Sequence, residues 1–172
     1  MIPAVFIGLF FEEEIEILFT GNITLVGSML IITGILLLLT KFSKEKRHQI
    51  SYSHSFIVGL SQAFAIIPGI SRSGATICTS LLLGNNKKQS AKFSFLMVIP
   101  LIFGKIIKDL FSDNIDFNNI DYIVYIFGFF SAFITGLFAC KLMLKIVKNN
   151  SLNIFSAYCI ILGLISIIIT SF

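Results

Sequence analysis

Four long apolar segments set the main constraint on how this chain can fold. Each is about 20 residues long, the length that an α-helix needs to cross the hydrocarbon core of a membrane. They cover residues 23–40, 93–110, 122–144 and 153–172. The chain of 172 residues is 56% hydrophobic and only 13% charged, well outside the usual composition of soluble domains. The sequence therefore predicts an all-α integral membrane protein, with these transmembrane helices in a single domain.

A fifth apolar segment, residues 55–84, is interrupted at its centre by PGISRSGAT at residues 68–76. Proline and glycine break a helix there, and the two halves, 56–67 and 76–83, are each too short to cross a membrane. An arginine at the bilayer centre costs at least about 2.5 kcal/mol, so Arg72 is expected only beside a polar cavity or an anionic ligand. We therefore predict a re-entrant hairpin with a phosphate-binding turn at its tip.

Charged residues in the connecting loops predict the orientation in the membrane. Basic residues flank the hairpin on both sides and also lie at the end of the segment 122–144 and just after it. They are Lys41, Lys44, Lys46 and Arg47, then Lys87, Lys88 and Lys92, and finally Lys141, Lys145 and Lys148. Acidic residues mark the other loops, at Glu12, Glu13, Glu14, Glu16, Asp113, Asp116 and Asp121. Because basic loops favour the cytoplasmic side, both ends of the hairpin are expected there and the acidic loops outside.

The net charge and the spacing of the cysteines argue against several other classes of function. The net charge of +4 comes from the loops and forms no basic, aromatic-interleaved surface, so no nucleic-acid partner is expected. Cys78, Cys140 and Cys159 are isolated in apolar sequence, without the spacing of a disulfide framework or a zinc site. They are expected to behave as small hydrophobic residues that face lipid or core.

Three residues of the turn are candidates for catalysis. Arg72 is expected to clamp phosphate oxygens, because a guanidinium matches their geometry and stabilises charge during phosphoryl transfer. The alternative is structural, with the arginine held by a carboxylate or by backbone carbonyls to fix the hairpin. Ser71 and Ser73 are candidate ligands or nucleophiles, although a nucleophilic serine needs a base and the sequence identifies none.

Four more residues are candidates for binding the same phosphate group. Thr76 is expected either to cap the second half-helix or to bond phosphate. Gln62 has two equal alternatives, orienting a ligand or bonding a neighbouring helix. Gly69 and Gly74 are expected to act through the backbone, which a missing side chain lets approach a ligand.

Other polar residues are expected to lie outside the site. His48 and His54 are in or beside the basic loop, and the expectation is solvated surface. Glu12 and Glu16 have the spacing of neighbours on one helix face, but they fall in a predicted external acidic loop. No metal ligand is identified in this chain.

PGISRSGAT closely resembles the second signature of the undecaprenyl-diphosphatase family, the bacitracin-resistance phosphatases. Gln62 in FIVGLSQAFAIIPG precedes it and KFSFLMVIP follows it, as in the family, and the resemblance runs the length of the chain. It implies an all-helical fold of two inverted repeats with a re-entrant hairpin in each. It also implies a multi-pass protein of the bacterial inner membrane that removes the terminal phosphate from the polyprenyl diphosphate carrier lipid of peptidoglycan synthesis.

The family's first signature, a glutamate-rich helix followed by a Pro-Val-Ser-Ser-Thr-Gly-His turn, has no counterpart here. The chain is therefore expected to be truncated at the N-terminus and to lack the first repeat hairpin, with MIPAVFIGLFF as the end of a helix. The absent residues are those usually assigned to metal binding and acid–base work. A divalent cation, Mg or Ca, is thus implied by the resemblance alone.

Two alternatives to the phosphatase stay open. Broken helices in inverted repeats also occur in transporters, so the chain is a candidate transporter or flippase of a phosphorylated lipid or anion. It is also a candidate inactive fragment of the phosphatase. Phosphate release from the lipid separates hydrolysis from transport. Membrane lipids are expected partners, and a homo-oligomer is compatible with the sequence.

Overall fold

The computed structural model describes residues 21–44, 50–111, 122–148 and 152–171, with six further positions before residue 21. Within these ranges every regular element is a helix. The elements are α3 (Ile23–Leu39), the short 3-10 helix η1 (Thr40–Phe42), α4 (Tyr52–Phe64), α5 (Arg72–Leu82), α6 (Lys87–Leu96), α7 (Val98–Phe111), α8 (Tyr122–Lys148) and α9 (Leu152–Ser171). Four stretches are long and apolar enough to cross a membrane, α6 and α7 forming one of them. The prediction of an all-α membrane protein is confirmed.

The helix bounds differ from the predicted spans mainly where polar residues extend a helix. The second crossing stretch begins at Lys87 and not at residue 93. Asn86 caps α6, because its side-chain oxygen accepts hydrogen bonds from the N–H groups of Lys88 (2.9 Å) and Gln89 (3.3 Å). A polar first turn therefore precedes the apolar run. Similarly, α8 continues to Lys148, past the predicted residue 144.

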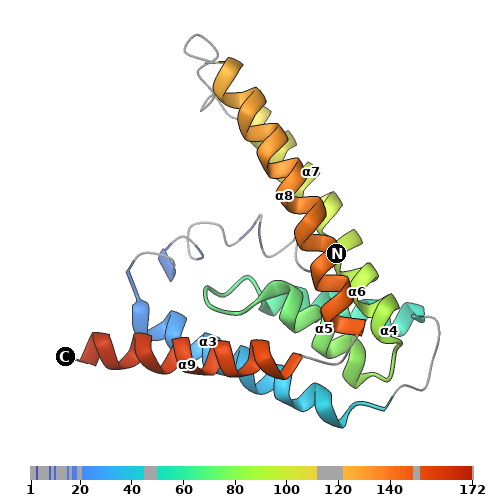
Figure 1. Ribbon diagram of the computed structural model, residues 1–172, viewed down its shortest axis with the longest axis vertical. Coiled ribbons are helices and arrows are strands. Elements are labelled where there is room, and N and C mark those ends of the chain that lie inside the picture. The colour runs from blue at the N-terminus through green and yellow to red at the C-terminus, as the bar shows by residue number, and fades with distance from the viewer. Residues whose placement is uncertain are drawn as a thin grey trace.

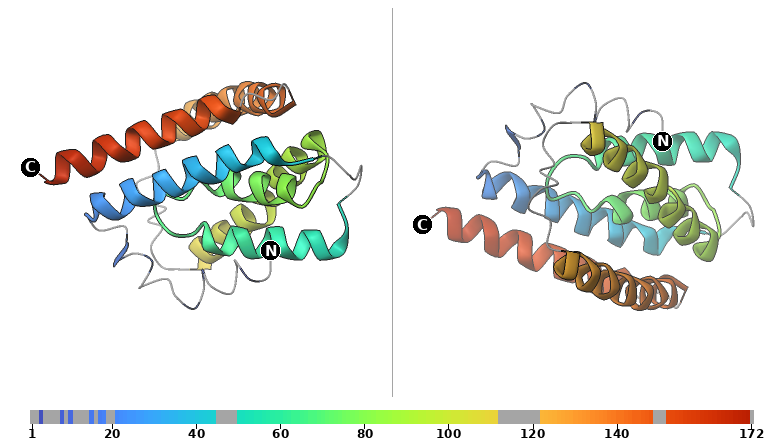
Figure 2. Two further views of the ribbon diagram at one scale, coloured as in Figure 1. Left: turned by 90° about the horizontal axis from the view of Figure 1, so that it is seen from below. Right: turned by 90° about the horizontal axis from the view of Figure 1, so that it is seen from above.

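Helices α3 and α9 pack against each other in antiparallel directions (Figure 2). Their backbones meet at two glycines, since a Cβ on Gly163 would lie 2.6 Å from the carbonyl oxygen of Gly27. Farther along the same contact, the Ser156 hydroxyl donates to the carbonyl of Gly34 at 2.6 Å. Small residues and hydrogen bonds between helices are the usual basis of helix pairing in membranes.

Helices α4 and α5 form the hairpin predicted for the interrupted segment and lie side by side (Figure 2). The turn between them is fixed at Gly69, whose φ of +93° lies in the left-handed region that favours glycine. A Cβ on Gly69 would collide with the carbonyl oxygen of Val26 and lie 2.9 Å from Cβ of Met29, both on α3. The turn is therefore seated directly on α3. Passage of this hairpin into and out of one membrane face stays a prediction.

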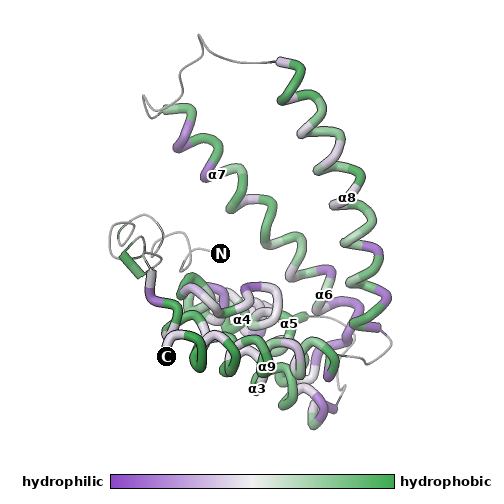
Figure 3. The backbone as a smooth tube through the Cα atoms, turned by 60° about the vertical axis from the view of Figure 1, so that its left-hand side comes forward, coloured by the Kyte–Doolittle hydropathy of each residue, from purple (hydrophilic) through white to green (hydrophobic). Residues whose placement is uncertain are grey.

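The packed centre of the molecule surrounds α5 and α6. Buried apolar side chains from five helices meet there, namely Leu37, Ile77, Cys78, Leu81, Ala91, Val147, Leu152 and Cys159. Away from this centre, α7 and the first part of α8 extend from the body (Figure 1). Their residues are mostly hydrophobic (Figure 3), and every α8 residue from Tyr122 to Leu142 is exposed. Surfaces of this kind suit contact with lipid.

Candidate functional site

The first turn of α5 is built from the motif itself. Ser71 is the N-cap, and its Oγ accepts a hydrogen bond from the N–H of Gly74 at 3.1 Å. The helix therefore begins at Arg72, four residues earlier than the predicted start at residue 76. Within the described part of the chain, the N–H groups of Arg72 and Ser73 have no acceptor, as is normal for a first turn. Such a helix end favours an anion.

Thr33 on α3 holds the turn in place. The backbone N–H of Ser71 donates to Oγ1 of Thr33 at 3.1 Å, and the Thr33 hydroxyl donates to the carbonyl of Met29 at 3.0 Å. Thr33 is 1% exposed. The sequence analysis did not identify this residue, although a hydroxyl within an apolar span is a signal for contact between helices.

Arg72 reaches the junction of α6 and α7. Its Nη2 donates to the carbonyl oxygen of Met97 at 3.2 Å, and the side chain is partly buried. This bond is of the kind expected from the structural alternative, an arginine held by a backbone carbonyl. A guanidinium carries five N–H groups, so the contact leaves further donors for an anion. The clamp on phosphate stays a prediction.

Two buried pairs of hydroxyl groups join α5 to α6, at positions that follow Arg72 along α5. Thr76 and Ser94 are 2.6 Å apart between Oγ1 and Oγ, and Ser80 and Ser90 are 2.7 Å apart. Since the N-cap is Ser71, the expectation that Thr76 caps the helix is wrong. Thr76 is 1% exposed and does not line the pocket described below. The structure thus places it in the packing between helices, and its contact with phosphate stays a prediction without support.

The other candidate binding residues fall into two groups. Gly74 lies at the pocket and is close-packed, because a Cβ there would lie 3.0 Å from the Ser71 side chain. Gly69 shapes the turn and is not a pocket residue. Gln62 is 2% exposed in the last turn of α4 and also lies away from the pocket lining. This position fits its second alternative, a contact within the helix packing.

His54 is not on a solvated surface, so that expectation is wrong. It lies in the first turn of α4, partly buried, with Nδ1 at 2.9 Å from Oδ1 of Asn85. Asn85 is 1% exposed and donates through Nδ2 to Ser80 at 3.1 Å. The histidine therefore ties α4 to the α5–α6 turn, away from the pocket. His48, Glu12 and Glu16 lie outside the described residues.

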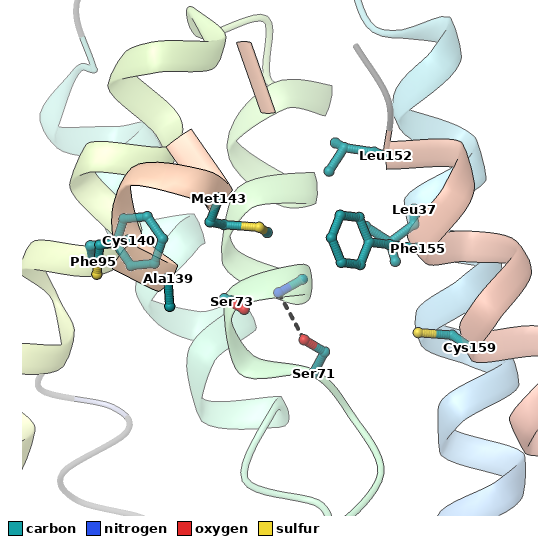
Figure 4. Close-up of a pocket in the computed structure, with 11 residues that line it drawn as sticks. Leu37, Ser71, Ser73, Phe95, Ala139, Cys140, Met143, Leu152, Phe155 and Cys159 are labelled. Atoms are coloured by element: carbon teal, nitrogen blue, oxygen red, sulfur yellow. Dashed lines mark hydrogen bonds between the residues drawn. The ribbon is translucent and has the colours of Figure 1, made fainter. Parts of the chain in front are cut away.

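A cavity of about 370 Å³ opens beside the first turn of α5 (Figure 4). Ser71, Ser73 and Gly74 form its polar end. The remaining lining residues are apolar or cysteine, namely Leu37, Phe95, Ala139, Cys140, Met143, Leu152, Phe155 and Cys159. The structure thus brings two predicted catalytic serines and one predicted binding glycine to a single pocket. It also shows that the pocket walls come from α3, α6, α8 and α9, which the motif alone did not indicate.

The residues that the structure describes do not gather the ligands that a divalent cation needs. No group of three His, Cys, Asp or Glu side chains gathers among them. The pocket lining offers hydroxyls but no carboxylate, while Mg and Ca prefer carboxylate and other oxygen ligands. The described residues therefore do not form a complete cation site, and no chemical step is assigned to a metal.

Comparison with known proteins gives a consistent result. A family described as bacitracin resistance protein BacA matches residues 1–165. The undecaprenyl-diphosphatase of Christiangramia forsetii is 53% identical over 168 residues, which are 98% of this chain and 64% of the relative. Proteins of the same name from Bacteroides thetaiotaomicron and Methanococcus maripaludis are each 44% identical, over 98% and 92% of this chain and 65% and 62% of the relatives. The chain thus spans slightly less than two thirds of the length of these relatives.

Proposed function

The chain belongs to the bacitracin resistance protein BacA family, and from this membership we propose that it acts as an undecaprenyl-diphosphate phosphatase. In this reaction water adds to the terminal phosphorus of the lipid diphosphate. The bond to the bridging oxygen breaks, leaving undecaprenyl phosphate and inorganic phosphate. The lipid product is the carrier used in cell-wall synthesis, which links the activity to bacitracin resistance. The proposed location is the bacterial inner membrane, with several membrane crossings.

The observation that carries this proposal is the polar end of the pocket. Hydroxyls of Ser71 and Ser73 meet the first turn of a helix in otherwise apolar surroundings. Arg72 adds a positive charge within the same turn, although its side chain is not part of the pocket lining and reaches the carbonyl of Met97. A phosphate is the group that such an arrangement favours, because helix N–H groups, hydroxyls and a guanidinium all donate to its oxygens.

Each residue has a distinct part in the proposed mechanism. The N–H groups of Arg72 and Ser73 and the Ser73 hydroxyl would hold oxygens of the diphosphate. Further guanidinium N–H groups would stabilise the charge that develops on the transferring phosphoryl group. Ser71 already caps the helix through Oγ, so its hydroxyl proton is the part left to donate. Among the described pocket residues there is no carboxylate or histidine to activate water, and no base is assigned.

The test is phosphate release from a polyprenyl diphosphate by the purified chain in liposomes. Arg72→Ala is expected to lower the rate by about 100-fold or more, the usual loss when a donor to a transition-state oxygen is removed. The rate of the Arg72→Lys variant should lie between those of the unchanged chain and Arg72→Ala, because lysine keeps the positive charge but not the forked geometry of the guanidinium. Lys92→Ala is the matched control, an exposed cation on α6 outside the pocket.

The outcomes separate the alternatives. Equal rates for Arg72→Ala and the unchanged chain would contradict the assigned role of Arg72. Binding of the lipid diphosphate without any phosphate release would contradict hydrolysis and favour a transporter. If the folded chain neither bound the lipid diphosphate nor released phosphate, these 172 residues would not be sufficient for the activity.

A further inference from the structure

The N-terminus of α5 takes part of its cap from another helix. In the common capping box, the backbone N–H of the N-cap residue donates to a Glu or Gln side chain at N3, three residues later. The N-cap of α5 is Ser71, so N3 is Gly74, which has no side chain. The N–H of Ser71 donates instead to Oγ1 of Thr33 on α3, at 3.1 Å. A neighbouring helix thus supplies the acceptor that the motif lacks.

This contact decides which N–H groups of the turn stay open. On one side, the N–H of Ser71 is taken by Thr33. On the other side, the N–H of Gly74 donates to Oγ of Ser71 at 3.1 Å, the bond dashed in Figure 4. Between them, the N–H groups of Arg72 and Ser73 have no acceptor within the described part of the chain. Two adjacent N–H groups at a helix N-terminus suit an anion.

The chemistry of the acceptor matters beside an anion. A Glu side chain at N3 would bring a negative charge into the turn and repel a phosphate. Thr33 accepts the same N–H through a neutral hydroxyl. Its own proton is directed to the carbonyl of Met29 at 3.0 Å, with the carbonyl of Gly69 at 3.4 Å, so a lone pair is left for the N–H of Ser71. The turn is therefore capped without adding negative charge near its open N–H groups.

We infer that Thr33 is a positioning residue of the phosphate site. It fixes the backbone at Ser71 so that the N–H groups of Arg72 and Ser73 face the phosphate, and it does this without touching the substrate. The inference rests on the proposed function and adds a residue of α3 to the site.

The packing of α3 makes it a firm support for this role. Thr33 is 1% exposed, and its Cγ2 lies 3.4 Å from the place that a Cβ on Gly74 would take. The next residue on α3, Gly34, accepts a hydrogen bond from the buried hydroxyl of Ser156 on α9 at 2.6 Å. Helix α3 is thus held by α9 as well as by the turn, so a change at Thr33 has little room to be absorbed elsewhere.

Removal of the Thr33 hydroxyl tests the inference. Thr33→Val keeps the shape of the side chain but cannot accept from Ser71, and should lower kcat/KM for a polyprenyl diphosphate by about 10- to 100-fold, since small displacements in a site have effects of this size. Thr33→Ser keeps the hydroxyl and should recover most of the rate. An unchanged rate in Thr33→Val, or no recovery in Thr33→Ser, would overturn the inference.

Thr40→Val is the matched control. Thr40 is buried like Thr33, and its hydroxyl donates to the carbonyl of Leu37 at 2.6 Å, with no bond to the hairpin among the described residues. Its loss should leave kcat/KM unchanged. A fall equal to that in Thr33→Val would show that any buried hydroxyl of this region has the same effect, and would overturn a specific role for Thr33.

A binding measurement separates positioning from stability. The chain has two arginines, Arg47 and Arg72, so isotopic labelling of arginine nitrogen gives two backbone amide signals, which Arg47→Lys assigns. Farnesyl methylenediphosphonate, whose methylene bridge resists hydrolysis, should shift the Arg72 amide proton downfield in micelles, because this N–H then bonds a phosphonate oxygen. In Thr33→Val the shift should be smaller and the analogue should bind about tenfold more weakly, the effect of about one lost hydrogen bond.

A purely structural role would give a different result. It would lower the fraction of folded protein, but the affinity and the Arg72 shift of the folded fraction would stay the same. That result, or the absence of an Arg72 shift in the unchanged chain, would overturn the inference. These readouts do not require hydrolysis. An Arg72 shift that depends on Thr33, found without any phosphate release, would support the positioning role and count against the phosphatase proposal alone.

Discussion

Nη2 of Arg72 and the backbone carbonyl oxygen of Met97 are 3.2 Å apart, at the point where α6 ends and α7 begins. Pro100 accounts for the break at this point. It has no N–H to donate to the carbonyl of Leu96, and its ring displaces the preceding turn. A carbonyl oxygen has two lone pairs, so that of Met97 can accept from Arg72 beside any bond within the helix. The position of the charge is thus coupled to the break between two helices.

Pro100→Ala is expected to lower phosphate release by about tenfold or more, since small displacements of a positioning group are costly. The alanine N–H can join α6 to α7 in a continuous helix and move the Met97 carbonyl that holds Arg72. Stability should be unchanged or higher, because the helix gains a hydrogen bond. Phosphate release and thermal unfolding in detergent are measured together, with the exposed neighbour Ile99→Ala as control. Full activity in Pro100→Ala would show that the helix break does not position Arg72.

The two serines of the turn should respond differently to removal of their hydroxyls. Ser71→Ala removes the N-cap bond to Gly74 and should destabilise the protein by about 0.5–2 kcal/mol, besides lowering phosphate release. Ser73→Ala removes a hydroxyl that makes no hydrogen bond within the described residues, so it should lower phosphate release while the unfolding temperature stays the same. Unfolding curves and rates for both variants provide the comparison. A loss of stability in Ser73→Ala equal to that in Ser71→Ala would contradict this division of roles.

The sequence predicted the features that depend on local pattern. The length of the apolar runs predicts the membrane-spanning helices, and Pro68 and Gly69 predict the turn of the hairpin. The polar extension of α6 to Lys87 was missed, because a search for apolar residues stops where a polar first turn begins. The motif at residues 68–76 also indicated Ser71 and Ser73 as candidates, and the structure brings both serines to one pocket.

The partners of the motif could not be predicted in the same way. Thr33 is 38 residues from Ser71, and Ser94 is 18 residues from Thr76. Their contacts depend on how separate helices pack, which no local pattern specifies. Thr76 illustrates the consequence. In the sequence, the hydroxyl of this fifth residue of α5 resembles a phosphate ligand, whereas in the structure it is a buried partner of Ser94.

The Thr76–Ser94 pair is expected to couple α5 to α6 energetically. Thr76→Val keeps the shape of the side chain but leaves the Ser94 hydroxyl without this partner, and should cost about 1–3 kcal/mol. Ser94→Ala should cost a similar amount. The double variant should be less destabilised than the sum of the two, because no hydroxyl is then left without its partner. Unfolding of the four proteins in detergent measures the coupling, and strictly additive losses would show that the pair does not interact in solution.

The seating of the hairpin on α3 predicts a strict requirement for glycine at position 69. Its φ of +93° is costly for any residue with a Cβ, and that Cβ would also collide with the Val26 carbonyl. Gly69→Ala should therefore destabilise the protein by more than about 1 kcal/mol, since strain at such a position alone costs about 1–3 kcal/mol. Gly104→Ala is the matched control, because a Cβ on this helical glycine meets nothing within 4 Å. It should be neutral or stabilising in the same unfolding measurement. If both alanine variants unfolded like the unchanged protein, the turn could not be seated on α3 as observed. A selective loss in Gly69→Ala would instead show that this contact holds the tip of the hairpin, and with it Ser71 and Arg72, in place.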